Sequence, residues 1–171
     1  MIDRIFLDTN ILVYAFDDNH PRKKNRSLEI LSGAGDNQQF VISTQVLQEF
    51  YVVVVRKLKR PLSQDDAESA VRRLVELPLV LIDSPMILSA IKVSREHGFS
   101  FWDSLIVQAA LEGGCRKLLT EDIQHGRQVA SVQIENPYLF PARVEPGLNR
   151  NVIVQRDASV QSHDKQTICN K

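Results

Sequence analysis

Two aspartates of this chain follow short apolar segments, at positions where a carboxylate can take part in chemistry. Asp8 comes directly after residues 5–7, and Asp122 lies just beyond residues 118–120. Both segments are typical of buried strands, and open α/β sheets bind ligands beyond the carboxyl ends of their strands. We therefore expect both carboxylates in one crevice. The structural alternatives are a turn and helix cap at Asp8, and a loop acid at Asp122 with Glu121 competing for its role.

Asp103 and Glu49 lie on predicted helices, at positions that can turn a carboxylate toward the same crevice. Asp103 is in the first turn of a helix that Ser100 caps, where an acid also favours the helix dipole. A capping role and a metal-binding role are compatible there. Glu49 lies at the margin of an apolar helical stripe and so faces the protein more than the water. A buried charge needs a partner, which is either a metal or an ion pair with Arg56 or Lys57.

Four converging carboxylates would need a cation. Two like charges ~5 Å apart repel by about 3 kcal/mol at an effective dielectric constant near 20. Mg²⁺ and Mn²⁺ prefer oxygen ligands and usually keep several waters, one of which can become a nucleophile. Since no His or Cys ligand accompanies the acids, phosphodiester hydrolysis fits the pattern better than zinc chemistry. The acids that predict this site are Asp8, Glu49, Asp103 and Asp122.

Strands that alternate with helices must position these acids. Apolar segments predict strands over residues 4–7, 40–42, 79–82, 117–120 and 132–134. Helical spacing and capping residues predict helices from about residue 11, over 24–31, from Ser43 or Thr44 to a stop at Pro61, over 62–77, over 84–97 and from Ser100 to Gly113. Residues 52–55 are β-branched and by themselves fit a strand, but the helical spacing extends beyond them. The alternation predicts an α/β fold with a central, mainly parallel sheet of about five strands and helices on both faces.

Composition sets broad limits on the class of protein. The 171 residues suffice for one domain, and 21 basic residues balance 21 acidic ones, so a uniform basic field is absent. No segment is typical of a signal peptide or of a membrane span, and Cys115 and Cys169 lack a zinc-like spacing, so we expect a cytoplasmic protein with free thiols. We expect the nuclease domain within residues 1–141 and a flexible, polar extension over residues 142–171.

Four sequence blocks, taken in order, resemble the PIN-domain family and especially its VapC-like toxin ribonucleases. They are residues 6–14, 45–51, 102–110 and 119–122, and residues 134–138 resemble the usual end of that domain. The resemblance covers about residues 2–140. It implies a Rossmann-like α/β/α sandwich and metal-dependent cleavage of RNA. It also implies the toxin of a toxin–antitoxin pair, held inactive by a cognate antitoxin and commonly a homodimer.

The resemblance also assigns roles to individual residues of this chain. Asp8, Asp103 and Asp122 fall at positions that bind the cation, Mg²⁺ or Mn²⁺, directly or through water. Glu49 falls at a position that binds the metal or orients the attacking water. The supporting polar positions, which hold the carboxylates in place, are Thr9, Asn10 and Thr120.

Other classes of protein fit the sequence less well. A haloacid-dehalogenase-like phosphatase needs a second aspartate at the position of Asn10, and a response-regulator receiver needs adjacent acids where Thr9 stands, although Asp83 offers a phosphoacceptor. The stronger alternative is a catalytically inactive PIN-like module that binds RNA or serves as a scaffold. The intact set of acids argues against that alternative, since an inactive site has no reason to keep mutually repelling carboxylates.

Basic stretches offer a second way in which the chain can meet RNA. The densest are residues 22–26 and 56–60, with Arg72 and Arg73 further along. They can contact RNA phosphates, which makes binding sensitive to salt. A solvated helix face is the more common meaning of such stretches.

Overall fold

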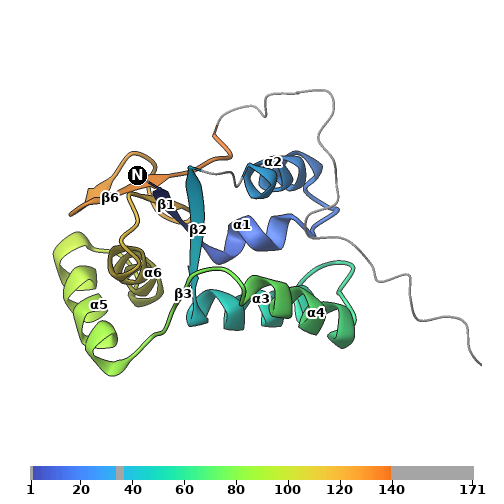
Figure 1. Ribbon diagram of the computed structural model, residues 1–171, viewed down its shortest axis with the longest axis horizontal. Helices are drawn as coiled ribbons and strands as arrows, with labels where there is room; N and C mark the ends of the chain where they lie inside the picture. Colours follow the sequence, from blue (N-terminus) through green and yellow to red (C-terminus); the bar gives the residue numbers. More distant parts are fainter. Residues whose placement is uncertain (1, 34–36, 140–171) are drawn as a thin grey trace, which may run out of the picture.

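A six-stranded sheet forms the centre of the computed structural model, which describes residues 2–33 and 37–139 (Figure 1). The strand order is β3-β2-β1-β4-β6-β5, and every neighbouring pair is parallel except β5 with β6. The strands are β1 (Asp3–Leu7), β2 (Gln38–Ser43), β3 (Leu79–Val80), β4 (Lys117–Leu119), β5 (Gln128–Val129) and β6 (Val132–Glu135). The predicted α/β class with a mainly parallel sheet is confirmed.

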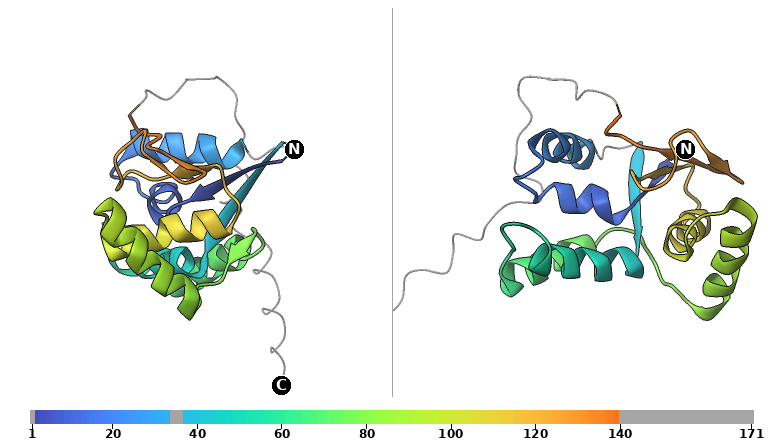
Figure 2. Two further views of the ribbon diagram at one scale, coloured as in Figure 1. Left: turned by 90° about the vertical axis from the view of Figure 1, so that its left-hand side faces the viewer. Right: turned by 180° about the vertical axis from the view of Figure 1, so that it is seen from behind.

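Helices cover both faces of this sheet. Within the described residues they are α1 (Thr9–Tyr14), α2 (Pro21–Ser32), α3 (Thr44–Arg56), α4 (Gln64–Leu74), α5 (Ser84–His97) and α6 (Phe101–Glu112). Figures 1 and 2 show α1 to α4 on one side of β2 and the α5–α6 pair on the other. On the first side α3 contacts both α1 and α4. The result is the α/β/α layering that the sequence predicts.

The order of the strands creates a switch point between β1 and β4. From β1 the chain moves outward through β2 to β3, then returns across the sheet and adds β4 on the other side of β1. The amide of Asp8, the residue after β1, donates a 3.0 Å hydrogen bond to the carbonyl oxygen of Leu119 at the end of β4. Open α/β sheets bind their ligands at such a point, beyond the carboxyl ends of the strands.

Burial on both faces explains the apolar central strands. Phe6 in β1, Leu118 in β4 and Ile134 in β6 are all fully buried, as expected where helices cover both faces of parallel strands. In α3, Val54 is fully buried, whereas Val52 is 42% exposed. Residues 52–55 therefore form part of a helix with one buried face, as the longer spacing predicts.

Several element boundaries differ from the sequence-based expectation. Helix α2 begins at Pro21 rather than near residue 24, because proline fits the first turn of a helix, where its missing N–H is not needed. Helix α4 ends at Leu74, before the expected end at residue 77, and β3 is shorter than expected. Strand β5 was not predicted, since two residues are too few to show an alternating pattern.

The predicted extension over residues 142–171 and Cys169 lie outside the described residues. Cys115 is a free, buried thiol, and burial raises its pKa to about 11. In the described part of the chain, no helix is both long and apolar enough to span a membrane.

Candidate active site

Asp8 lies at the centre of a hydrogen-bonded network between the ends of β1 and β4. Its Oδ1 accepts a 2.7 Å hydrogen bond from the Thr9 amide, which makes it the N-cap of α1. Its Oδ2 accepts a 2.6 Å hydrogen bond from the hydroxyl of Thr120, the residue after β4. Asp8 is only 6% exposed and Thr120 is fully buried. The cap predicted as a structural alternative is therefore present, but it occupies only one of the two carboxylate oxygens.

The surroundings of Asp8 favour its protonated form. Burial, helped by the negative charges of Asp122 and Glu49, raises the pKa of Asp8 to about 7. The hydrogen bonds from Thr120 and the Thr9 amide act in the opposite direction. A positive charge beside Asp8 would favour the ionised carboxylate and lower this pKa again, so the site is suited to a cation.

Asn10 connects Asp8 with the second strand-end acid. Its Nδ2 donates to Asp122 Oδ2 at 3.0 Å and lies 3.3 Å from both Asp8 Oδ2 and Thr120 Oγ1. The Thr120 hydroxyl oxygen also accepts a 3.1 Å hydrogen bond from the Asp122 amide. Asn10 and Thr120 therefore hold Asp8 and Asp122 in fixed relative positions. The Oδ1 atom of Asn10 is buried and, among the described residues, has no hydrogen-bond partner.

Glu49 reaches the same network from α3. Its Oε2 accepts a 2.9 Å hydrogen bond from the Thr9 hydroxyl, and its Oε1 accepts a 2.9 Å hydrogen bond from Nε2 of Gln45. The side chain is half-buried, as its place at the margin of the apolar stripe predicts. These two donors take the place of the ion pair with Arg56 or Lys57 that the sequence left open.

Asp103 joins the group from the start of α6. Its amide donates a 3.1 Å hydrogen bond to the Ser100 hydroxyl oxygen, and that hydroxyl donates back to Asp103 Oδ2 at 2.7 Å. Ser100 is thus the helix cap that the sequence predicts. Asp103 contributes its negative charge to the site, as the environment of Asp122 shows.

The pKa of Asp122 reports which acids surround it. Burial raises this pKa first of all, and the charges of Glu121, Asp103 and Glu49 raise it further, while the hydrogen bond from Asn10 lowers it. The charges of three acids, from α3, α6 and the segment after β4, therefore act on one carboxyl group. The structure brings the predicted acids to one edge of the sheet, with Asp103 linked to the others by charge rather than by a hydrogen bond.

Glu121 points toward a different set of partners than Asp122. Its Oε2 lies 2.5 Å from the ammonium of Lys23 on α2, and its Oε1 accepts a hydrogen bond from the hydroxyl of Tyr14 at the end of α1. Of the two adjacent acids, only Asp122 bonds to Asn10. The geometry therefore gives these two adjacent acids different partners.

A family model decides which family has this arrangement. A model described as the PIN domain matches residues 5–129. The chain belongs to the PIN domain family. The matched span includes all of the candidate acids, namely Asp8, Glu49, Asp103 and Asp122.

Solved structures similar to this PIN domain include several toxin–antitoxin proteins. VapBC2 from Rickettsia felis, bound to a DNA fragment from its promoter, is 23% identical with a TM-score of 0.54, over 78% of this chain and 98% of that chain. A toxin–antitoxin complex from Klebsiella pneumoniae is 18% identical with a TM-score of 0.59, at the same coverage. VapC20 from Mycobacterium tuberculosis, a sarcin–ricin loop cleaving toxin, is 16% identical with a TM-score of 0.51. The match covers 67% of this chain and 86% of that chain. These similarities show the fold. No curated protein matches the sequence.

The donor set of this PIN domain fits a hard cation with few protein ligands. Within residues 2–33 and 37–139, no three His, Cys, Asp or Glu side chains form a group arranged to hold a metal ion. Mg²⁺ commonly takes one or two carboxylates and keeps several waters, so Asp8 and Asp122 are sufficient in number and type. The Asn10 side chain, whose Nδ2 contacts both carboxylates, also carries a buried Oδ1 that has no hydrogen-bond partner among the described residues. We therefore take Mg²⁺ or Mn²⁺ as the metal to test.

Sequence reasoning missed three residues that shape this site. Gln45, only 4% exposed, donates to Glu49 and lies 3.4 Å from the carbonyl oxygen of Trp102, beside Asp103. Its position four residues before Glu49 on one helix is a signal that could have identified it. Tyr14 and Lys23 were also missed, because their contact with residue 121 depends on the packing of α1 and α2.

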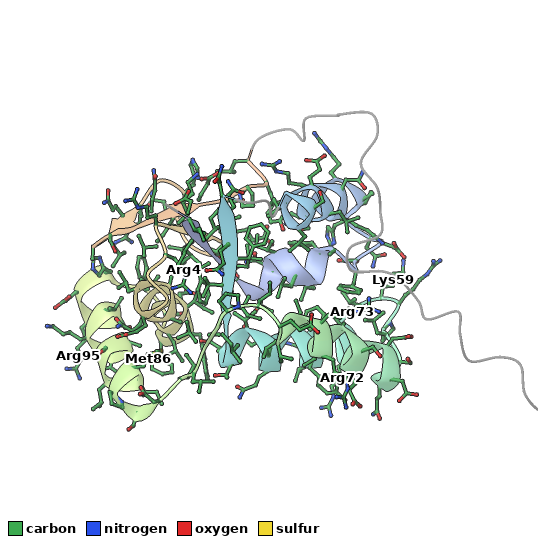
Figure 3. The ribbon with its side chains drawn as sticks, viewed as in Figure 1. Arg4, Lys59, Arg72, Arg73, Met86 and Arg95 are labelled. Carbon is green, nitrogen blue, oxygen red and sulfur yellow. The ribbon has the colours of Figure 1, made fainter. Side chains whose placement is uncertain are left out.

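Some cations of the basic stretches pair with acids that lie near them in the sequence. Lys24 pairs with Asp18 at 2.6 Å, and Arg72 pairs with Glu68 on the next turn of α4 at 2.5 Å. Figure 3 shows Arg72 on the outer side of α4, pointing away from the sheet. For these cations the structure favours a solvated helix face.

Proposed function

We propose that this PIN domain is a metal-dependent endoribonuclease that uses Mg²⁺ or Mn²⁺. The observation that carries the proposal is the state of Asp8. It is buried at the switch point of the sheet, its pKa is raised to about 7, and the charges of Asp122 and Glu49 act on it. Ionisation of a carboxyl group buried in this way is unfavourable, and a purely structural helix cap does not require it. A divalent cation bound beside Asp8 would stabilise the ionised carboxylate.

The proposal assigns a role to each of the four acids. Asp8 and Asp122 hold the cation, directly or through water, with Asp103 adding negative charge from α6. Glu49 orients the attacking water or completes the metal site, and Thr9 and Gln45 fix its two oxygens. A divalent cation held there would supply a water-derived nucleophile at neutral pH and would offset charge on the phosphate.

The supporting residues hold the two strand-end acids in this geometry. Thr120 and Asn10 bind Asp8 and Asp122 through hydrogen bonds of 2.6 to 3.3 Å. Partners of this kind orient ligands that would otherwise turn away from one another. Such preorganisation supports a reacting site rather than a binding scaffold.

We further propose that the chain is the toxin of a toxin–antitoxin pair. The similarity to VapBC2, to VapC20 and to the toxin–antitoxin complex from Klebsiella pneumoniae supports an antitoxin as partner and RNA as substrate. We propose that the chain acts on RNA in the cytoplasm and, as the resemblance implies, forms a homodimer. The nuclease domain would occupy residues 1–141, with residues 142–171 as an extension.

Cleavage of a pool of structured RNAs by the purified, antitoxin-free chain tests the proposal. We expect cutting with Mg²⁺ or Mn²⁺ and none in EDTA, and we expect an Asp8→Ala/Asp103→Ala double variant to be inactive. A folded wild-type chain that binds neither Mg²⁺ nor Mn²⁺ by calorimetry and does not cut would contradict it and favour an inactive binding module. Single-stranded DNA belongs in the same assay as a competing substrate.

A further inference from the structure

We propose that Lys23 and Tyr14 are positioning residues, which hold Glu121 out of the acidic site so that only Asp122 of this adjacent pair serves it. The inference rests on the proposed function. It explains a cluster between α1, α2 and the residues after β4 that the reaction itself does not use.

Both oxygens of the Glu121 carboxylate are bound within this cluster. Oε2 lies 2.5 Å from Nζ of Lys23, and Oε1 accepts the Tyr14 hydroxyl hydrogen. The Lys23 ammonium also donates to the Tyr14 hydroxyl oxygen at 2.8 Å. The three groups therefore form a closed ring of contacts, and Glu121 cannot turn toward Asp122 without breaking two of them.

Two aromatic rings fix the ammonium in this place. Nζ of Lys23 lies 4.4 Å from the ring centroid of Tyr14 and 5.4 Å from that of Tyr138, within the range of cation–π attraction. The Tyr14 and Tyr138 rings pack edge to face at 5.2 Å, and the Tyr138 hydroxyl shares a 2.7 Å hydrogen bond with Ser27 of α2. The side chains of Lys23 and Glu121 are only 33% and 20% exposed. This is a built contact rather than a loose surface ion pair.

The need for such a contact follows from the position of Glu121 in the sequence. It stands directly before Asp122, so its carboxylate lies next to the acidic site along the chain. Without a cation beside it, Glu121 would add a fifth carboxylate to the site and could compete for the metal. Lys23 neutralises that charge, and Tyr14 holds the carboxylate toward the helices.

The same contacts argue against a direct role of Lys23 in RNA binding. Its ammonium already serves Glu121 and Tyr14 and lies against two rings. A phosphate contact would require this arrangement to open. Removal of the Glu121 charge separates RNA binding by Lys23 from positioning of Glu121. A lysine that binds phosphate would be needed for cleavage whether or not Glu121 carries a charge.

The test compares full-length Lys23→Met, Glu121→Gln and Lys23→Met/Glu121→Gln with wild type. For each we would measure Mn²⁺ affinity by calorimetry, RNA cleavage rate and the free energy of unfolding. For Lys23→Met we expect cleavage to fall about 10- to 100-fold, the effect usual for lost ligand positioning. We expect Mn²⁺ to bind more tightly, by roughly tenfold, since one unpaired negative charge is added near a divalent cation. The double variant should recover the wild-type cleavage rate and Mn²⁺ affinity, because the amide that replaces the Glu121 carboxylate brings no charge into the site.

Two further variants keep the result interpretable. Lys24→Met makes the same charge change on α2 but removes only a pairing with Asp18, so cleavage and Mn²⁺ affinity should stay at wild-type values. Tyr14→Phe keeps the ring and removes only the hydroxyl, so it should act like Lys23→Met but more weakly, even if Lys23→Met folds poorly.

Three outcomes would overturn the inference. If wild type binds Mn²⁺ and both Lys23→Met and Tyr14→Phe keep wild-type Mn²⁺ binding and cleavage, this inference is overturned while the proposed function stands. A double variant as impaired as Lys23→Met would assign Lys23 to the RNA instead. A wild-type chain that binds no Mn²⁺ would overturn the proposed function and this inference with it.

Discussion

The Thr120 hydroxyl donates a 2.6 Å hydrogen bond to the carboxylate of Asp8 and so joins the ends of the two central strands. The same hydroxyl oxygen accepts a hydrogen bond from the Asp122 amide. One buried side chain therefore sets the position of both strand-end acids. The loss of this hydroxyl should affect chemistry more than stability.

Thr120→Val tests that role with a side chain of nearly the same shape. The Thr120 hydrogen bond lowers the pKa of Asp8, so its loss should raise that pKa above 7 and keep the carboxyl group protonated at higher pH. Cleavage at pH 7 should fall about 10- to 100-fold, and the rising limb of the pH–rate profile should move to higher pH. A profile that coincides with that of wild type would show that Thr120 does not act on Asp8.

Metal-free protein should lose stability as the pH rises from about 4 to about 7. The pKa of Asp8 is 3.8 in the unfolded reference and about 7 in the folded protein. Between these values the unfolded chain releases the proton and the folded chain keeps it, so the contribution is complete below pH 3.8 and is lost as the pH rises through 7. The slope from this group is at most about 1.4 kcal/mol per pH unit.

Urea unfolding in EDTA at several pH values, followed by circular dichroism, measures that slope. Asp8→Asn should flatten the profile and should be more stable than wild type near pH 8, because the buried charge is gone. Parallel profiles for the two proteins would contradict the raised pKa of Asp8.

Asp103 should combine a structural role with a functional one, and two substitutions separate them. Ser100→Ala removes the helix cap and should lower the free energy of unfolding by about 1 kcal/mol, while most cleavage activity is retained. Asp103→Asn keeps an oxygen that accepts the Ser100 hydroxyl hydrogen, so stability should change little and cleavage should be lost. Urea unfolding and RNA cleavage of both variants give the answer. If the two substitutions reduced cleavage equally, the carboxylate would serve only α6.

Gln45→Leu should reduce cleavage about tenfold at little cost in stability. The amide fixes one oxygen of Glu49, but its own Oε1 is buried without a partner among the described residues. Removal of that unpaired oxygen offsets the lost hydrogen bond. Unfolding and cleavage measured on the same preparation check the prediction, and an unaffected cleavage rate would show that Glu49 needs no support from Gln45.

The main features of the site could be predicted because they depend on local patterns. Asp8 and Asp122 follow apolar segments whose strand character is evident. Ser100 is a typical N-cap residue and so predicts the start of the helix that carries Asp103. Once these elements are placed in an α/β fold, the carboxyl ends of the strands bring the acids to one edge. Glu49 followed from its place on the margin of a helical stripe.

The rest depends on packing between segments far apart in the sequence. Nothing local to Lys23 indicates that it binds Glu121, and the basic stretch around it suggested an exposed face. The resemblance favoured Asp122 over Glu121, but the different partners of these two acids depend on the positions of Asn10 and Tyr14. Strand β5 escaped prediction because a two-residue strand carries no periodic signal.

A comparison of the cleavage rates of wild type and Asp8→Asn, in Mn²⁺ and at equal fraction folded, tests whether the charge of Asp8 is needed to hold the catalytic cation. Asparagine keeps the size of the side chain and its oxygen acceptor for Thr120 but removes the charge that would hold the cation. The exposed Asp65 on α4 provides Asp65→Asn as a matched control that should cut like wild type. We expect Mn²⁺-dependent cutting by wild type and by the control and none by Asp8→Asn, whereas equal cutting by all three would show that the reaction does not need the Asp8 carboxylate.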